Sequence, residues 1–133
     1  MTTFFTFVYV GVGGMAGAMA RYGLLLLMQG TTQVFPLATL AANLAGCFLI
    51  GVIAELAAGV AGFPPQARLL LVTGFCGGFT TLSSLVFELD RLLREGEFQV
   101  GGIYLLATLA GGYLALWLGM WAIRLLMLNW LQY

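Results

Sequence analysis

Hydroxyl, amide and phenol groups are the side chains of this sequence that could do chemistry, and their spacing places them on helical faces. They form three sets: Thr39 with Asn43, Thr81 with Ser84 and Glu88, and Tyr104 with Thr108. Most of these groups donate hydrogen bonds, which a small hydrated anion needs in place of its water. A polar group costs free energy in lipid and is expected to face a bundle interior. The three sets therefore indicate a polar pathway for an anion, although each set alone could serve only to form hydrogen bonds between helices.

One stretch of glycines and hydroxyls, residues 73–84, is unusual within an apolar segment. Glycine weakens a helix there, and hydroxyls can satisfy freed backbone groups. We expect a break in the helix from about Gly74 to Thr81. Broken helices at membrane depth occur where the backbone lines a cavity or coordinates an ion. Freed carbonyls would be hard oxygen ligands, suited to a small cation.

Other chemistries are missing from the sequence. It has no histidine, so Ser-His and His-metal sites are excluded, and we find no catalytic constellation that would make an enzyme. Cys47 and Cys76 lie in apolar stretches and are expected to be small buried residues. Arg21, Glu55 and Glu88 lie toward the ends of apolar segments, so no charge is expected at mid-membrane.

The composition is that of an integral membrane protein. The chain has 133 residues, of which 62% are apolar and 8% are charged, whereas a soluble domain has about 25% charged residues. Its mean hydropathy is +1.03. A soluble enzyme and a disordered segment are excluded on these grounds. The net charge of zero supplies no basic patch for nucleic acid.

Four apolar segments are long enough to span a membrane as helices. They run over residues 4–28, 35–60, 68–89 and 100–128, separated by a polar break at 29–33, a Pro-Pro loop and a charged stretch at 90–97. We therefore predict an all-α integral membrane fold in which residues 1–133 form a single unit of four antiparallel helices.

The arginines barely specify an orientation in the membrane. Arg68 and Arg124 fall on one side, and Arg21, Arg91 and Arg94 fall on the other. One interpretation is that the chain inserts both ways and pairs head to tail. The alternative is that the charge rule is uninformative here.

Small residues at a spacing of four predict close helix contacts. The longest such ridge is Ala107, Gly111, Ala115 and Gly119, and shorter ones are Gly13 with Gly17 and Ala42 with Gly46. Four tightly packed helices enclose little room for a pathway, which favours an oligomer.

Three segments, residues 13–22, 39–46 and 73–81, resemble the Fluc (CrcB) family of fluoride channels. The match runs through all four spans, and Glu88 and Tyr104 also fall where that family has them. The resemblance implies a multi-pass protein of the bacterial inner membrane that exports fluoride passively. It also implies an antiparallel dual-topology homodimer in lipid, with two fluoride pores along the interface.

The resemblance assigns roles residue by residue. The backbones of Gly77 and Thr80 would hold a structural sodium ion, and Asn43 would donate to fluoride. Arg21 would lie near a pore entrance. The polar track along the pore would comprise Thr39, Thr81, Ser83, Ser84, Glu88, Tyr104 and Thr108.

The chain departs from the family pattern at two pore positions. Leu82 and Leu85 stand where the family usually has phenylalanine, and leucine lacks the electropositive ring edge. Phe79 and Phe87 are nearby but on different helical faces, and Gly112 stands where a serine is common. Three possibilities follow: conduction with altered affinity, one half of a heterodimer, or a weak or non-conducting paralogue. We favour a conducting channel.

Two other functions are compatible with four short spans. A proton-coupled multidrug transporter needs an acid deep in the membrane, and the first span has none. A non-conducting subunit of a larger membrane assembly would explain the ridges of small residues but not the broken third span.

Overall fold

The computed structural model describes residues 2–30 and 34–130, and its regular secondary structure over these ranges is helical. The elements are α1 (Thr2–Leu27), α2 (Leu37–Gly59), α3 (Pro65–Arg68), the π-helix η1 (Leu69–Cys76), α4 (Gly77–Phe79), α5 (Leu82–Arg94) and α6 (Phe98–Trp130). Of the expected polar break, residues 31–33 lie outside the described ranges.

Four helical spans in these ranges are long and apolar enough to cross a membrane. They run over Thr3–Leu27, Leu37–Gly59, Pro65–Arg94 and Phe98–Leu128. The prediction of four transmembrane helices with a discontinuity in the third is therefore confirmed. The third span is longer than expected, because α5 continues to Arg94 instead of ending near Leu89.

Local sequence explains where the helices begin and end. Pro36 precedes α2, and α3 starts at Pro65, a position where a missing backbone N–H costs nothing. Gly62 and Gly96 adopt φ of 81° and 82° in the two loops that follow α2 and α5. Residues with a Cβ rarely adopt this conformation, so glycine allows both chain reversals.

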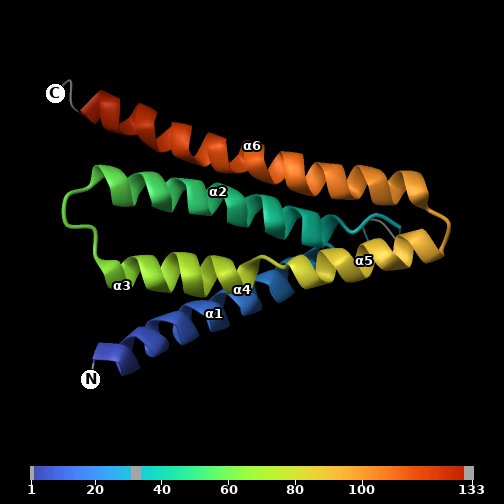
Figure 1. Ribbon diagram of the computed structural model, residues 1–133, viewed down its shortest axis with the longest axis horizontal. Helices are drawn as coiled ribbons and strands as arrows, with labels where there is room; N and C mark the ends of the chain where they lie inside the picture. Colours follow the sequence, from blue (N-terminus) through green and yellow to red (C-terminus); the bar gives the residue numbers. More distant parts are fainter. Residues whose placement is uncertain (1, 31–33, 131–133) are drawn as a thin grey trace.

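The spans run up, down, up and down, so α1 begins and α6 ends at the same end of the molecule (Figure 1). α6, α2 and the third span lie roughly side by side, and α1 crosses the third span obliquely near α4. The break between α4 and α5 lies near the middle of the third span, where α1 approaches it (Figure 1).

Glycines set the two closest helix crossings. A Cβ on Gly17 would overlap the Phe75 carbonyl of η1, and one on Gly78 would overlap the Gly14 carbonyl of α1. Between α2 and α6, a Cβ on Gly119 would overlap the Phe48 carbonyl. The prediction that small residues mediate close helix contacts is confirmed at these positions.

The buried core lies beyond the break, toward the α5–α6 turn. Leu85, Leu92 and Tyr104 form its centre, with Phe35, Leu40 and Val100 packed against it. This core fixes α5 against α2 and α6. Most large apolar side chains elsewhere point outward, as expected of helices that face lipid.

Candidate ion pathway

The third span is interrupted at two residues, Thr80 and Thr81. Both have extended backbones, with φ and ψ of −85° and 159° at Thr80 and −153° and 118° at Thr81. The interruption is narrower than the expected range from Gly74 to Thr81, because the backbone stays helical through Phe79. The glycines before it are instead accommodated in the wider turns of η1 and in α4.

Hydroxyl groups satisfy the helix ends on either side of the break. The Thr80 hydroxyl donates to the Cys76 carbonyl at 2.9 Å. The Thr81 hydroxyl accepts from the Ser84 amide at 3.2 Å and so caps α5. The Thr81 hydroxyl thus satisfies an amide that a continuous helix would have bonded internally. The Cys76 carbonyl keeps its helical bond from the Thr80 amide, also at 2.9 Å, and takes the Thr80 hydroxyl as a second donor.

Asn43 bridges the break from α2. Its Oδ1 accepts from the Thr81 amide at 2.8 Å, and its Nδ2 donates to the Thr81 carbonyl at 3.2 Å. The side chain is 9% exposed. This pair of hydrogen bonds fixes the orientation of the amide and holds the extended backbone in place. One N–H of the Asn43 amide is not used in this pair.

The break changes the bonding of two carbonyls of α4. In a continuous helix the Thr81 amide would donate to the Gly77 carbonyl, four residues earlier. It donates to Asn43 instead, so the Gly77 carbonyl loses its helical donor. The Gly78 carbonyl accepts from Arg21 Nε on α1 at 3.2 Å. Arg21, expected toward the end of its span, thus reaches the break.

Glu88 ties together three helices on the other side of the break. Its Oε1 accepts from the Thr39 hydroxyl at 2.8 Å, and its Oε2 accepts from the Tyr104 hydroxyl at 2.6 Å. Tyr104 is fully buried, and the Phe35 ring contacts it edge-on, with centroids 5.6 Å apart. Both donors fix the carboxylate within the bundle, which supports the expectation that these polar faces point inward.

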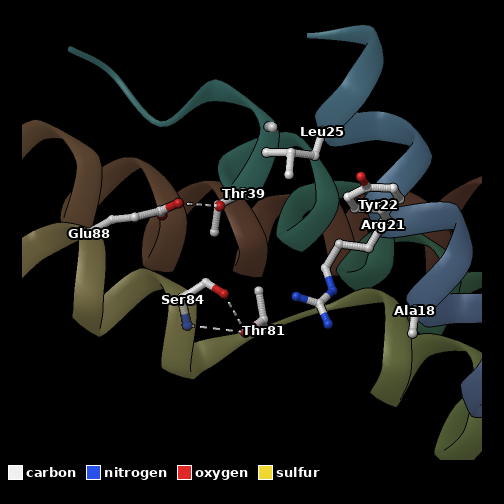
Figure 2. Close-up of a pocket in the computed structure, with 9 residues that line it drawn as sticks. Ala18, Arg21, Tyr22, Leu25, Thr39, Thr81, Ser84 and Glu88 are labelled. Atoms are coloured by element: carbon white, nitrogen blue, oxygen red, sulfur yellow. Dashed lines mark hydrogen bonds between the residues drawn. The ribbon is translucent and has the colours of Figure 1, made fainter. Parts of the chain in front are cut away.

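A central cavity of about 260 Å³ lies beside these groups (Figure 2). Figure 2 shows Arg21 reaching from α1 toward Thr81, while the hydrogen-bonded Thr39 and Glu88 lie on the other side of the space. The lining residues come from α1, α2, the break and α5: Ala18, Arg21, Tyr22, Leu25, Ala38, Thr39, Thr81, Ser84 and Glu88. The cavity therefore carries charges of both signs. Arg21 and Glu88 start toward the ends of their spans, as expected, and both line this cavity.

An outer cavity of about 260 Å³ shares Leu25, Ala38, Thr39 and Glu88 with the central one. Its other walls come from residues just after α1, from residues 35–37 at the start of α2, and from Arg91 on α5. Since four residues line both cavities, the two are neighbours. Together they lead from the α1–α2 turn to the break.

A side cavity of about 290 Å³ is lined by Asn43 and by Thr81, which also lines the central cavity. Leu82, Leu85 and Thr108 line it, with Cys47 and Gly112. The Thr108 hydroxyl donates to the Tyr104 carbonyl of its own helix at 2.8 Å. Thr108 therefore separates from the Glu88 cluster and belongs to this second, more apolar space.

The remaining candidate residues lie around the break in different settings. Ser83 is exposed, and its hydroxyl lies 3.1 Å from that of Thr81. Leu82 is 71% exposed, whereas Leu85 is 3% exposed and belongs to the core. Gly77, the first residue of α4, is exposed, and Thr80, which follows α4, is half-buried.

Sequence reasoning missed many of the residues that line the cavities, including three on α1 and one cysteine. Ala18, Tyr22 and Leu25 lie on the face of α1 that includes Arg21, so a helical repeat from Arg21 would have found them. Cys47, expected to be buried, is half-buried and lines the side cavity. Only its spacing of four residues from Asn43 could have indicated this. Cys76 is buried, as expected.

Comparison with known proteins places this architecture in one family. The family model described as "CrcB-like protein, Camphor Resistance (CrcB)" matches residues 8–120. The "Fluoride-specific ion channel FluC" of Chlorobium chlorochromatii is 52% identical over 115 residues, covering 86% of this chain and 89% of that protein. Proteins of the same name from Prosthecochloris aestuarii and Cupriavidus necator are 49% identical over 111 residues and 42% identical over 120 residues. Those matches cover 84% and 90% of this chain, and 87% and 95% of the relatives.

Proposed function

This chain belongs to the CrcB-like protein family, and we propose that it is a fluoride-specific ion channel, rather than an enzyme, in the bacterial inner membrane. The observation that carries the proposal is similarity along most of the chain to proteins named as fluoride-specific channels. A channel lets fluoride leave the cell passively. In acidic surroundings fluoride is protonated to neutral HF, which enters the cell and is trapped there as the anion. A pore that lets the anion leave therefore relieves its toxicity.

The cavities support a route for the anion. Fluoride that enters the outer cavity passes Thr39 and Glu88 and reaches Arg21 in the central cavity. The Arg21 guanidinium attracts the anion, and the unused N–H of Asn43 can replace part of its water. Thr81 lines both the central and the side cavity, so the break is the point at which the anion crosses between them.

The side cavity offers weaker binding than the central one. Leu82 and Leu85 supply apolar walls without a ring edge, Tyr113 is an aromatic residue in its lining, and the Thr108 hydroxyl is bonded to its own helix. Conduction requires binding that is strong enough to admit the ion and weak enough to release it. We therefore assign fluoride selection to Asn43 and Thr81, with the leucines as apolar walls.

A second copy of this chain completes the channel in our proposal. Three exposed residues lie near the break: Gly77, Leu82 and Ser83. Around a lone chain, lipid would contact the Ser83 hydroxyl and the Gly77 backbone at this depth. Such groups are costly in lipid and are normally buried in protein. An antiparallel homodimer that covers this face fits the near balance of arginines at the two ends.

A structural sodium ion fits the backbone before the break. The Gly77 carbonyl loses its helical donor to the Asn43 bridge, and the Ser84 amide, which would bond the Thr80 carbonyl in a helix, donates to the Thr81 hydroxyl. Carbonyl oxygens are hard ligands that suit a small cation. Gly77 and Thr80 would hold sodium, which would neutralise the carbonyl dipoles where two subunits meet.

Growth of a fluoride-sensitive bacterium tests the proposal in cells. A strain that lacks its own fluoride exporter should grow in fluoride medium when it expresses this chain. The matched control is Asn43→Asp, which keeps the size of the side chain but removes the donor to Thr81 and adds a negative charge. No rescue by the wild-type chain, at membrane levels equal to those of a rescuing relative, would overturn the proposed function.

A further inference from the structure

Arg91 lies on the wall of the outer cavity, one turn beyond Glu88 on the same face of α5. The next arginine along the helix, Arg94, does not line any of the three cavities described above. Both arginines lie near the end of α5 that leads into α6. The two residues therefore differ in their access to the pathway.

The charge of Arg91 is only weakly paired. Its Nε lies 3.9 Å from Glu95 Oε1, and the two side chains are 46% and 55% exposed. By contrast, Arg94 Nε donates to Asp90 Oδ2 at 2.7 Å. A long, half-exposed ion pair contributes little and leaves most of the field of the guanidinium in place.

The charges along the cavities alternate in sign. Arg91 and Glu88 face the outer cavity, and Glu88 and Arg21 face the central one. Both Glu88 oxygens accept hydrogen bonds from neutral hydroxyls, which leaves the carboxylate without a cationic partner among these contacts. An anion that enters the outer cavity would be repelled by Glu88 unless a cation near the mouth of that cavity offset the charge of the carboxylate.

We propose that Arg91 is that cation: it concentrates small anions at the mouth of the outer cavity and lowers the fluoride concentration at which the channel half-saturates. The inference rests on the proposed function and adds a recruiting residue to it. One unit charge at about 8–10 Å changes a local ion concentration roughly twofold in water, and the effect fades at high salt. A cavity wall of low dielectric strengthens it.

Planar bilayers of neutral phosphatidylcholine provide the test, because their surface adds no charge of its own. Fluoride currents are measured against fluoride concentration for wild type, Arg91→Gln, Arg91→Lys and the matched control Arg94→Gln. For Arg91→Gln we expect the half-saturating concentration to rise roughly two- to fourfold at low salt. The saturating current should stay unchanged, and the difference should disappear near 1 M inert salt. Arg91→Lys and Arg94→Gln should behave as wild type.

Three results would overturn the inference while leaving the proposed function intact. The first is a half-saturating concentration in Arg91→Gln that equals that of wild type. The second is a shift in Arg94→Gln as large as the shift in Arg91→Gln. The third is an Arg91→Gln channel that loses only saturating current. The last result would mean that Arg91 serves the structure of α5. The absence of fluoride current from the folded wild-type chain would instead count against the channel itself.

Discussion

Glu88 is the residue on which three helices converge, and its two oxygens make separate hydrogen bonds to Thr39 and Tyr104. The sequence placed these three residues on inward-facing stripes by helical spacing alone. It did not indicate that they meet at one carboxylate, because spacing gives the face of a helix but not its height relative to a neighbour.

Removal of either donor to Glu88 should weaken the bundle. Tyr104→Phe keeps the buried ring and loses only the hydroxyl. Thr39→Val, on α2, replaces the hydroxyl by a methyl group and keeps the branched shape of the side chain. Each should lower the free energy of unfolding by about 0.6–1.7 kcal/mol, the range for hydrogen bonds between membrane helices. Unfolding in mixed detergent micelles measures both variants and their combination.

The double variant distinguishes a shared network from two independent contacts. Because both hydroxyls act on one carboxylate, the combined loss should differ from the sum of the single losses by more than about 0.5 kcal/mol. Strict additivity would contradict the view that Glu88 is held jointly.

The leucines of the side cavity give a second test at this scale. Leu82→Phe together with Leu85→Phe should place electropositive ring edges beside Asn43. We expect the half-saturating fluoride concentration to fall roughly two- to tenfold, equivalent to about 0.5–1.5 kcal/mol, as for aromatic pair contacts. Fluoride currents in bilayers measure it. The double change to isoleucine, which adds no ring, should leave it unaltered, and an equal shift there would argue against the role of the ring edge.

At the scale of elements, α1 can approach the third span closely because glycines face each other where they cross. The Gly13–Gly17 spacing predicted that the first span packs closely against another helix, and the structure shows that its partners are the backbones of η1 and α4. The π-helical turns of η1 were not predictable from the same pattern. They depend on how η1 fits against α1, which a single helix does not reveal.

Alanine substitutions of two glycines on different faces of α1 should change the free energy of unfolding differently. The new methyl group of Gly17→Ala would overlap the Phe75 carbonyl, so we expect a loss of about 1–3 kcal/mol. Gly11→Ala meets no atom within 4 Å and should be neutral or stabilise by up to about 1 kcal/mol. Unfolding in detergent compares the two. Equal losses would mean that α1 does not cross the third span in this register.

The break itself carries the sodium proposal. Exchange of sodium for a large organic cation, such as N-methyl-D-glucamine, should lower the thermal stability of the purified protein and slow fluoride flux, because the Gly77 and Thr80 carbonyls would lose the ion that they bind. Thermal unfolding at constant ionic strength measures this. A melting temperature that is independent of the cation would contradict a bound structural ion.

For the whole molecule, composition and hydropathy sufficed to predict four antiparallel spans, because a chain this apolar has few alternatives to a membrane bundle. The position of the discontinuity was predicted less sharply. Glycines at residues 74, 77 and 78 suggested a wide break, but all three are helical, and two of them, Gly74 and Gly78, pack against α1. The chain opens only where Asn43 replaces the lost helical bond. Long-range contacts of this kind cannot be inferred from local propensity.

Similarity to known channels and the cavities around Asn43 and Thr81 lead to the same central claim, that copies of this chain form a fluoride-selective pore without a different partner subunit. The most direct test is ion efflux from liposomes that contain the purified chain, with sodium present, measured for fluoride and for chloride in parallel. We predict fast fluoride efflux, no chloride efflux above that of protein-free vesicles, and loss of fluoride efflux in Asn43→Asp. Well-folded wild-type protein that releases neither ion, or both at equal rates, would contradict the account.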